Sequence, residues 1–360
     1  MRKTKIAVIG LKGLPAFGGA ATVGENIIRE LCNDFEFTVL SVSSHTSINN
    51  TEINGVRQII FNNHGKGGLN TFLYYLKCMF FVLFNKFDLI HLHHGSSGFI
   101  TPFLRLKYNV ILTFHGVHRD KDDPKFSALQ NLFIRFSQKL NIKFSSTLVS
   151  VSKPDKKYLE NRFRRSVIYI PNGINIHQTK KKAEKNYLSF AAGRIYQIKG
   201  LHYLLESIHK LKDKIPLVVA GDINQVQNYK DKIFELSRGL DVNFLGLLKD
   251  KNQLLDEIRN SRLFIFPSVT EAMSMMLLEV VSTKTPIIAS DIPANKAIFS
   301  DEEILFFKSE DSNDLSLKLE FALANEDIMK SKAKLAFEKL EKEYVWERIS
   351  DEYLKIFNNN

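Results

Sequence analysis

The 360-residue sequence has little cysteine: Cys32 and Cys78 are the only two, and neither lies in a spacing typical of metal ligands. This scarcity excludes a disulfide scaffold and indicates a reducing compartment. Long apolar runs are also lacking. The run in MRKTKIAVIG is too short for a signal peptide, and Lys77 interrupts the most apolar stretch, Leu69–Phe87. We therefore expect a buried or partly inserted helix in that stretch and no transmembrane span.

Acidic residues are scarce in the first half of the chain. Residues 1–175 contain 23 Lys and Arg but 11 Asp and Glu, whereas the remainder contains 27 and 28. The asymmetry indicates a polyanionic partner, such as nucleic acid or an anionic membrane, although a merely basic surface would look the same. Because an obvious recognition helix and an aromatic-studded RNA motif are both missing, we expect no nucleic-acid partner.

The segment Phe126–Phe144 predicts an amphipathic helix. Its apolar side chains form one stripe, and cations lie beside them: Leu129, Leu132, Phe133, Phe136 and Leu140, with Lys125, Arg135, Lys139 and Lys143. Most such stripes face a core, but a basic amphipathic helix can also lie on a membrane. The sequence leaves both interpretations open.

Strand-like and helix-like segments alternate along the whole chain. The β-rich runs are KIAVIG, FTVLSV, VRQIIF, DLIHLH, NVILTFHG and STLVSVS, then YLSFAAGRI, IPLVVAGD, VNFLG, LFIFPS, PIIAS and ILFF. Such alternation is typical of parallel sheets covered by helices on both faces. We predict an α/β protein with two doubly wound, Rossmann-like domains, 1–175 and 176–342, linked near HQTKKKAEKN. Ligands of such sheets bind beyond the carboxyl ends of the strands, so we expect the site in a central cleft between the domains.

Two strand-end loops have residues suited to phosphate. In GLKGLPAFGGAATVGENIIREL, Gly18 and Gly19 come at the start of a helix, where backbone N–H groups attract anions, although the GxGxxG fingerprint is absent. In GRIYQIKG, Arg194 and Lys199 supply two cations, as a diphosphate leaving group requires. Taken alone, the second pattern is equally typical of surface charges at a strand end.

The stretch FPSVTEAMSMMLLEVVSTKTPIIASD has two glutamates in apolar surroundings. We predict a buried helix from Met273 to Val281, entered beside Glu271 and containing Glu279. A buried carboxylate is costly unless something pairs with it. One interpretation is a favourable helix dipole at Glu271 and a solvated Glu279. The other is a long ligand that contacts both, since eight helical residues span about 12 Å and separate the side chains by about 80°.

These motifs together resemble glycosyltransferase family 4, the retaining, nucleotide-sugar-dependent enzymes of GT-B fold. The resemblance rests on GRIYQIKG followed by Glu271 and Glu279, and on the GG loop, DLIHLH, TFHG, IPNGIN, VNFLG and TPIIASD, and it covers essentially the whole chain. It implies an N-terminal acceptor-binding domain and a C-terminal donor-binding domain. The ending YVWERISDEYLKIF also fits, because the last helix of this fold typically returns to the first domain. We therefore expect residues 343–360 to pack there.

The resemblance also implies roles for individual residues. Arg194 and Lys199 would hold the donor's diphosphate and stabilise the charge that develops on it, which makes them catalytic. Glu279 would accept hydrogen bonds from the ribose, and Glu271 would lie near the transferred sugar. The other expected contacts are Gly18 and Gly19 with the diphosphate, the backbone near Met275 and Met276 with the phosphate or sugar, and His115 of TFHG with the transferred sugar.

One departure from the family affects the donor. The family commonly has an aromatic residue and then a glycine where this chain has Met273 and Ser274. Because a serine side chain would crowd or hydrogen-bond the sugar, we include Ser274 among the expected donor contacts and do not carry the donor's identity across.

No metal or cofactor is expected. Asp88 is the only acid near DLIHLHHG, and we interpret His91, His93 and His94 as acceptor contacts or packing residues. We predict a metal-independent retaining glycosyltransferase acting on a saccharide or lipid-linked saccharide, in synthesis of a cell-surface polysaccharide such as capsule, O-antigen or lipopolysaccharide. It would be cytoplasmic and contact the anionic inner face of the cell membrane through its basic first domain. A sugar-nucleotide epimerase and a non-catalytic sugar-nucleotide-binding protein remain alternatives.

Overall fold

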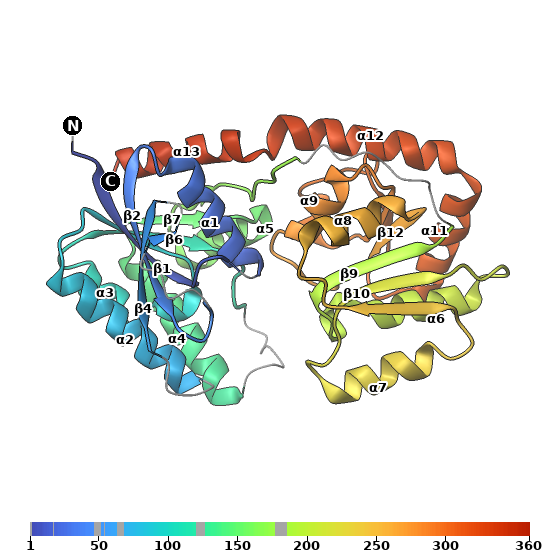
Figure 1. Ribbon diagram of the computed structural model, residues 1–360, viewed down its shortest axis with the longest axis horizontal. Coiled ribbons are helices and arrows are strands. Elements are labelled where there is room, and N and C mark those ends of the chain that lie inside the picture. Colours follow the sequence, from blue (N-terminus) through green and yellow to red (C-terminus); the bar gives the residue numbers. More distant parts are fainter. Residues whose placement is uncertain are drawn as a thin grey trace. The chain divides into compact units, whose positions relative to one another are not determined.

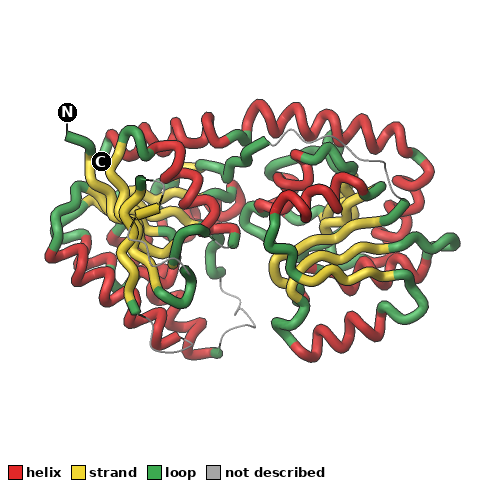
Figure 2. Tube along the Cα trace, in the orientation of Figure 1, coloured by secondary structure: helices red, strands yellow, loops and turns green. Residues whose placement is uncertain are grey.

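The computed structural model describes residues 2–16, 18–46, 52–53, 55–62, 68–119, 127–176 and 186–360. The chain divides into a first unit, Met1–Gly173 with Trp346–Asn360, and a second unit, Ile174–Val345. These divisions lie two and three residues from the predicted domain boundaries. Most of the predicted linker HQTKKKAEKN lies outside the described residues. Each unit has a central sheet between helices, so the predicted α/β class with two doubly wound domains is confirmed (Figures 1 and 2).

The described residues of the first unit contain an eight-stranded sheet in the order β3-β4-β2-β1-β5-β6-β7-β8. Its strands are β1 (Thr4–Lys12), β2 (Phe35–Val42), β3 (Glu52–Ile53), β4 (Val56–Phe61), β5 (Leu89–Leu92), β6 (Asn109–Phe114), β7 (Thr147–Ser150) and β8 (Ile168–Tyr169). All pairs are parallel except β3 with β4. Strands β3 and β8 were not predicted, because two-residue strands are too short to show a pattern.

Helices cover both faces of this sheet. One face packs on α2 (Gly68–Phe84), α3 (Thr101–Leu104), α4 (Ala128–Phe144) and α5 (Lys153–Phe163), which contribute to one apolar cluster with the strands. On the other face lie α1 (Gly19–Leu31) and the C-terminal helix α13 (Trp346–Asn358), which contact each other. The ring of Phe357 in α13 packs edge-on against Phe35 of β2, at 5.4 Å between centroids. The last helix therefore completes the first unit's core.

The described part of the second unit contains a six-stranded parallel sheet in the order β11-β10-β9-β12-β13-β14. Its strands match the six predicted runs: β9 (Leu188–Arg194), β10 (Leu217–Asp222), β11 (Val242–Gly246), β12 (Leu263–Phe266), β13 (Ile287–Ser290) and β14 (Leu305–Phe307). Its helices are α6 (Leu201–Lys210), α7 (Gln227–Leu236), α8 (Lys251–Asn260), α9 (Met275–Ser282), α10 (Pro293–Lys296), α11 (Ser312–Ala324) and α12 (Glu326–Glu343).

The strand order reverses once in each sheet. In the first unit the reversal lies between β1 and β5, and in the second between β9 and β12. Ligands of doubly wound sheets bind at such switch points, beyond the carboxyl ends of the strands. The two switch points therefore tell us where each unit's binding residues should be found.

The predicted amphipathic helix is α4, and its apolar stripe does not face the core. The side chains of Leu129, Leu132 and Phe136 are 76%, 57% and 55% exposed, whereas polar residues such as Ser137 and Asn141 are buried. The core interpretation of the stripe is therefore wrong for these three residues. Lys125 and Phe126, which belong to the predicted segment, lie outside the described residues. In the described ranges, no helix is both long and apolar enough to cross a membrane.

Candidate functional site

The glycine loop of the first unit leads from β1 into α1. Gly18 is the N-cap of α1 with φ of 105°, a conformation that favours glycine, and Gly19 is the first helical residue. A Cβ built on Gly18 would meet no atom within 4 Å, so there is open space beside the backbone. The first turn of α1 contains no acidic residue. The positive end of this helix therefore remains available to an anion.

His115 directly follows β6, and its ring is partly buried. Its Nε2 lies 3.0 Å from Nδ1 of His93, and burial lowers the pKa of His115 to about 3. His91 and His93 are buried, at 1% and 2% exposure, so packing is the correct alternative for these two rings. His94 uses its Nδ1 to accept the backbone N–H of Ser96. Among the described residues, no three His, Cys, Asp or Glu side chains are grouped to hold a metal ion.

The switch point of the second unit brings Lys199 and Glu271 together. Lys199 lies in the 3-10 helix η2 (Gln197–Lys199) after β9, and its Nζ is 2.6 Å from Oε1 of Glu271, which follows β12. The two side chains are 22% and 13% exposed, so the ion pair is largely shielded from water. Arg194, at the end of β9, is exposed, and its side chain has no hydrogen bond or ion pair to another described residue. Arg194 is thus free to bind a ligand, whereas Lys199 is already paired with a carboxylate.

Close backbone contact fixes the two loops that hold this pair. Gly200 caps α6 with φ of 72°, and a Cβ there would lie 2.0 Å from the carbonyl oxygen of Pro267. Only glycine therefore fits. In the next contact, the N–H of Val269 donates to the carbonyl of Ile198 at 2.8 Å. The loop after β9 and the loop after β12 therefore contact each other directly through their backbones.

The structure corrects the predicted position of Glu271. The helix expected from Met273 is α9, which begins at Met275 because the Ser274 side chain caps it by accepting the N–H of Leu277. Glu271 therefore lies in the loop before α9, outside the helix dipole's first turn, and the axial spacing expected for two glutamates on one helix does not apply. The N–H groups of Met275 and Met276 have no partner among the described residues, as expected for a helix N-terminus.

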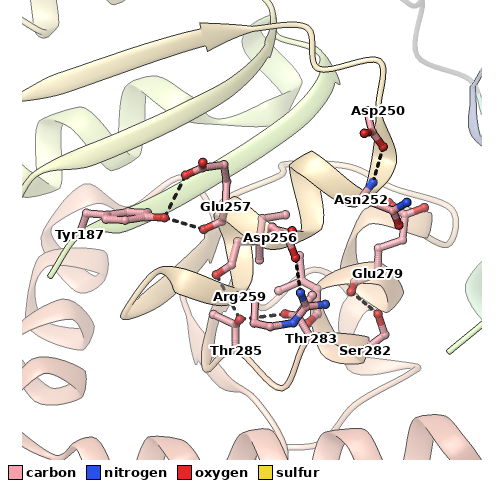
Figure 3. Close-up of polar contacts among 12 residues, drawn as sticks. Tyr187, Asp250, Asn252, Asp256, Glu257, Arg259, Glu279, Ser282, Thr283 and Thr285 are labelled. Atoms are coloured by element: carbon pink, nitrogen blue, oxygen red, sulfur yellow. Dashed lines mark hydrogen bonds and ion pairs between the residues drawn. The ribbon is translucent and has the colours of Figure 1, made fainter. Parts of the chain in front are cut away.

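Glu279 is buried on α9 and paired with a residue that the sequence analysis missed. Its Oε1 lies 2.8 Å from Nζ of Lys251, the first residue of α8. Figure 3 shows Glu279 with its carbonyl bonded to Ser282, and it shows α8 anchored by Tyr187, whose hydroxyl donates to the carbonyl of Glu257. Because Lys251 and Glu279 lie on different helices, no local sequence pattern could have connected them.

The predicted residues thus form two groups. Arg194, Lys199, Glu271 and Glu279 lie in the second unit with the N-terminus of α9, while Gly18, Gly19 and His115 lie at the strand ends of the first. The charged residues of the second unit can neutralise a diphosphate and hold hydroxyl groups. The residues of the first unit offer uncharged N–H groups and a neutral ring.

Comparison with known proteins gives matches along nearly the whole chain. The model described as Glycosyltransferase Family 4 matches residues 17–178, and the model described as Glycosyl transferases group 1 matches residues 174–339. An uncharacterised glycosyltransferase of Methanocaldococcus jannaschii is 24% identical over 344 residues, 93% of this chain and 92% of the relative. The N,N'-diacetylbacillosaminyl-diphospho-undecaprenol alpha-1,3-N-acetylgalactosaminyltransferase of Campylobacter jejuni is 25% identical over 256 residues, 66% of each chain. The crystal structure of Anabaena HepE in complex with UDP and glucose aligns with a TM-score of 0.81 and 16% identity, over 99% of this chain and 100% of that one.

Proposed function

The chain belongs to glycosyltransferase family 4 and has the GT-B fold, and from this premise we propose a retaining, metal-independent enzyme that uses a nucleoside-diphosphate sugar. The observation that carries the proposal is the Lys199–Glu271 pair at the switch point of the second unit, with the unpaired Arg194 beside it. A diphosphate that enters this site gains two cations without a bound metal. The carboxylate of Glu271 is then available to the sugar.

The reaction breaks the bond between the sugar's anomeric carbon and the β-phosphate oxygen, and it forms a bond from that carbon to an acceptor hydroxyl oxygen. The hydroxyl proton passes to the departing phosphate oxygen on the same face of the sugar, so the anomeric configuration is kept. Arg194 and Lys199 stabilise the charge on the leaving diphosphate, as preorganised donors do in other active sites. Glu271 stabilises positive charge at the anomeric carbon, and Glu279 accepts hydrogen bonds from the ribose.

A donor panel tests this function. The protein is incubated with UDP- and GDP-sugars and saccharide acceptors, and the anomeric coupling constant of the product is read by NMR. We expect transfer with retention, unchanged by EDTA. Inversion, or loss of activity in EDTA that Mg²⁺ restores, would contradict the proposal. An epimer formed from the donor alone would establish the epimerase alternative, and binding without turnover on any acceptor would establish the non-catalytic one.

We propose a lipid-linked saccharide as the acceptor, in the synthesis of a cell-surface polysaccharide. One support is the Campylobacter jejuni relative, whose name states that it acts on a diphospho-undecaprenol-linked sugar. The second support is a surface on the first unit that fits an anionic membrane, which would place the enzyme on the inner face of the cell membrane. This surface is named the α2–α4 face: Leu69, Leu73, Phe80 and Phe84 of α2, with Leu129, Leu132 and Phe136 of α4.

The α2–α4 face is apolar where a free surface would normally be polar. On α2 its residues are spaced by four, seven and four positions, which forms a single stripe along the helix. Their exposed fractions range from 40% at Leu73 to 84% at Phe84. The rings of Phe72 and Phe133 pack at 6.3 Å between centroids, which shows that α2 and α4 are neighbours. Exposed apolar side chains gathered on two neighbouring helices mark an interaction surface.

Charge favours an anionic bilayer as the occupant. The sequences of α2, α3 and α4 contain no acidic residue. The exposed cations nearby are Lys86, Arg105, Lys107, Lys139 and Lys143. An apolar stripe flanked by cations binds anionic lipid by burying apolar area and by Coulomb attraction.

Vesicle co-sedimentation tests the α2–α4 face. Wild type is compared with Phe80→Ser/Phe84→Ser and with Phe321→Ser, a matched change at an exposed phenylalanine of the second unit. We expect wild type and Phe321→Ser to sediment with phosphatidylglycerol vesicles and the double variant to remain in solution. Equal binding of wild type to phosphatidylcholine vesicles, or undiminished binding of the double variant, would contradict the proposal.

A further inference from the structure

A chain of hydrogen bonds runs from His115 into the interior of the first unit. His115 Nε2 lies 3.0 Å from His93 Nδ1, and His93 Nε2 lies 3.2 Å from His91 Nδ1. His91 Nε2 then lies 2.9 Å from Thr113 Oγ1, and Thr113 Oγ1 lies 3.5 Å from the hydroxyl of Tyr353 on α13. The chain thus joins the end of β6 to the C-terminal helix through two buried imidazoles.

The rings of this chain are neutral. Burial lowers the pKa of His91 and of His115 to about 3, and it holds the pKa of His93 well below its ordinary value. Each neutral ring has one N–H donor and one bare nitrogen that accepts. The three hydrogen bonds made by the rings must therefore all run in the same direction, so the rings have only two possible arrangements.

Counting protons distinguishes the two arrangements. In the outward one, Tyr353 donates to Thr113, and Thr113 donates to His91. His91 then donates to His93, and His93 donates to Nε2 of His115. Every hydroxyl and ring proton then has an acceptor, and His115 has its own proton on Nδ1. In the inward one, Thr113 accepts from His91, and its hydroxyl either donates to Tyr353 or accepts from it as well, since a hydroxyl oxygen has two lone pairs. In either case one of two buried hydroxyl protons, that of Tyr353 or that of Thr113, has no acceptor in the described part of the chain. Because an unsatisfied buried donor is unfavourable, the outward arrangement is preferred.

We propose that Thr113, His91 and His93 are positioning residues that hold His115 in its Nδ1–H tautomer, so that it presents a hydrogen-bond donor to an oxygen of the transferred sugar. The identity of that ligand rests on the proposed function, whereas the tautomer does not. Nε2 of His115 is hydrogen-bonded to His93, so Nδ1 is the ring nitrogen left for a ligand. The described residues provide Nδ1 with no partner. The consequence for specificity is a preference for donors with an oxygen at that position over their deoxy analogues.

The tautomer can be measured without any turnover. In protein labelled with ¹⁵N at histidine and saturated with UDP, long-range ¹H–¹⁵N NMR distinguishes the two ring nitrogens. We expect His115 as the Nδ1–H tautomer at neutral pH. An Nε2–H tautomer at His115 in the wild type would overturn the proposal. If the protein transfers no sugar at all, the proposed function fails while this measurement still stands.

Thr113→Val tests the chain itself, since it replaces the hydroxyl by a methyl group of similar size. His91 Nε2 is then unpaired in either arrangement, so we expect both tautomers of His115 at comparable populations. The catalytic efficiency with the sugar donor should fall about twofold or more, in proportion to the lost population of the Nδ1–H tautomer. The affinity for UDP should stay unchanged. Thr113→Ser, which restores the hydroxyl, should restore one tautomer and the rate.

Tyr353→Phe is the matched control. It removes the Tyr353 hydroxyl, but the inward arrangement would then leave the Thr113 proton without an acceptor among the described residues. Thr113 therefore still donates to His91, and His115 should keep a single tautomer. A single Nδ1–H tautomer in Thr113→Val would show that the chain does not set it. If Tyr353→Phe and Thr113→Val gave the same mixture of His115 tautomers, the effect would be explained by a general disturbance of the core. Either result would overturn the proposal.

Discussion

The two units share the same order over six parallel strands but differ in the chemistry at their switch points. In the second unit, strand ends present Arg194 and the ion pair between Lys199 and Glu271. In the first unit, the corresponding edge presents the backbone of Gly18 and the neutral ring of His115. The same strand order can therefore hold a site made of charges or one made of uncharged hydrogen-bonding groups.

This difference changes the meaning of the charge asymmetry in the sequence. The first half of the chain has the whole basic excess, yet none of its predicted site residues has a side chain charged at neutral pH. Exposed cations such as Lys86, Lys107 and Lys139 lie instead around the α2–α4 face. Part of the excess thus lies on an outer surface, and the charges of the predicted donor site belong to the nearly neutral second half.

The largest expected effect removes a charge from the second unit's switch point. Lys199→Ala should lower turnover by about 100- to 1000-fold, the loss seen when one preorganised donor to a developing anion is removed. The measurement is kcat with the best donor, with a thermal melt to show that the variant is folded. Lys210→Ala, at the other end of α6, is the control and should keep wild-type turnover. Wild-type turnover in Lys199→Ala would remove Lys199 from the site.

Lowering the pH should destabilise the first unit more than the second. His91 and His93 of the first unit have lowered pKa values in the folded state, so the unfolded chain binds more protons below its own pKa of about 6.5. Their contribution is fully present above pH 6.5 and is lost as pH falls toward 3. His91 should cost the first unit about 1.5 kcal/mol between pH 6.5 and 5, at a slope that approaches about 1.4 kcal/mol per pH unit, and His93 adds to the loss in the same direction.

The second unit contains fewer such groups in its described part, where His202 has its pKa lowered to about 4. Hydrogen exchange at pH 7 and pH 5, corrected for intrinsic rates, measures the protection of backbone amides in both units in one sample. We expect protection to fall further in peptides from β5 and β6 than in peptides from β9 and β12. An equal loss in both sets of peptides would contradict the contrast between the units.

A smaller effect is expected at the far end of the second unit's site. Glu279→Gln should weaken UDP binding about tenfold, since hydrogen bonds to a charged group contribute about 1.5–3 kcal/mol and the amide retains part of that. Isothermal titration measures the affinity, and Glu257→Gln on the adjacent α8 is the control. An unchanged UDP affinity in Glu279→Gln would show that the carboxylate serves only its pair with Lys251.

Twelve of the strands were predictable because they are short runs rich in apolar and β-branched residues, and the twelve predicted runs correspond to them. Arg194, Lys199 and Glu271 could be placed at one edge, because β9 and β12 are neighbours whose carboxyl ends meet. The chain from His115 to Tyr353 was not predictable in the same way. It depends on which face of β6 packs on the C-terminal helix, and that is decided by tertiary packing rather than by local pattern.

The start of α9 was predicted two residues early for a physical reason, and that reason yields the smallest expected effect. Met273 extends an apolar run, but the Ser274 hydroxyl accepts the Leu277 N–H and so ends the loop at that residue. Ser274→Ala should cost about 1 kcal/mol of stability, whereas Ser274→Gly should cost only a few tenths, because glycine is a tolerable N-cap. Thermal melts of both variants measure the difference.

The same pair of variants tests the predicted contact between Ser274 and the donor. A hydroxyl that accepts the Leu277 N–H still has a proton to donate, so capping and sugar recognition are compatible. If Ser274 also contacts the sugar, both variants should lose selectivity between donors, although only Ser274→Ala is appreciably destabilised. If the hydroxyl is only a cap, Ser274→Gly should retain both stability and selectivity. In that case the serine where the family commonly has glycine would be explained by the helix, and the donor's identity would have to be determined by other residues.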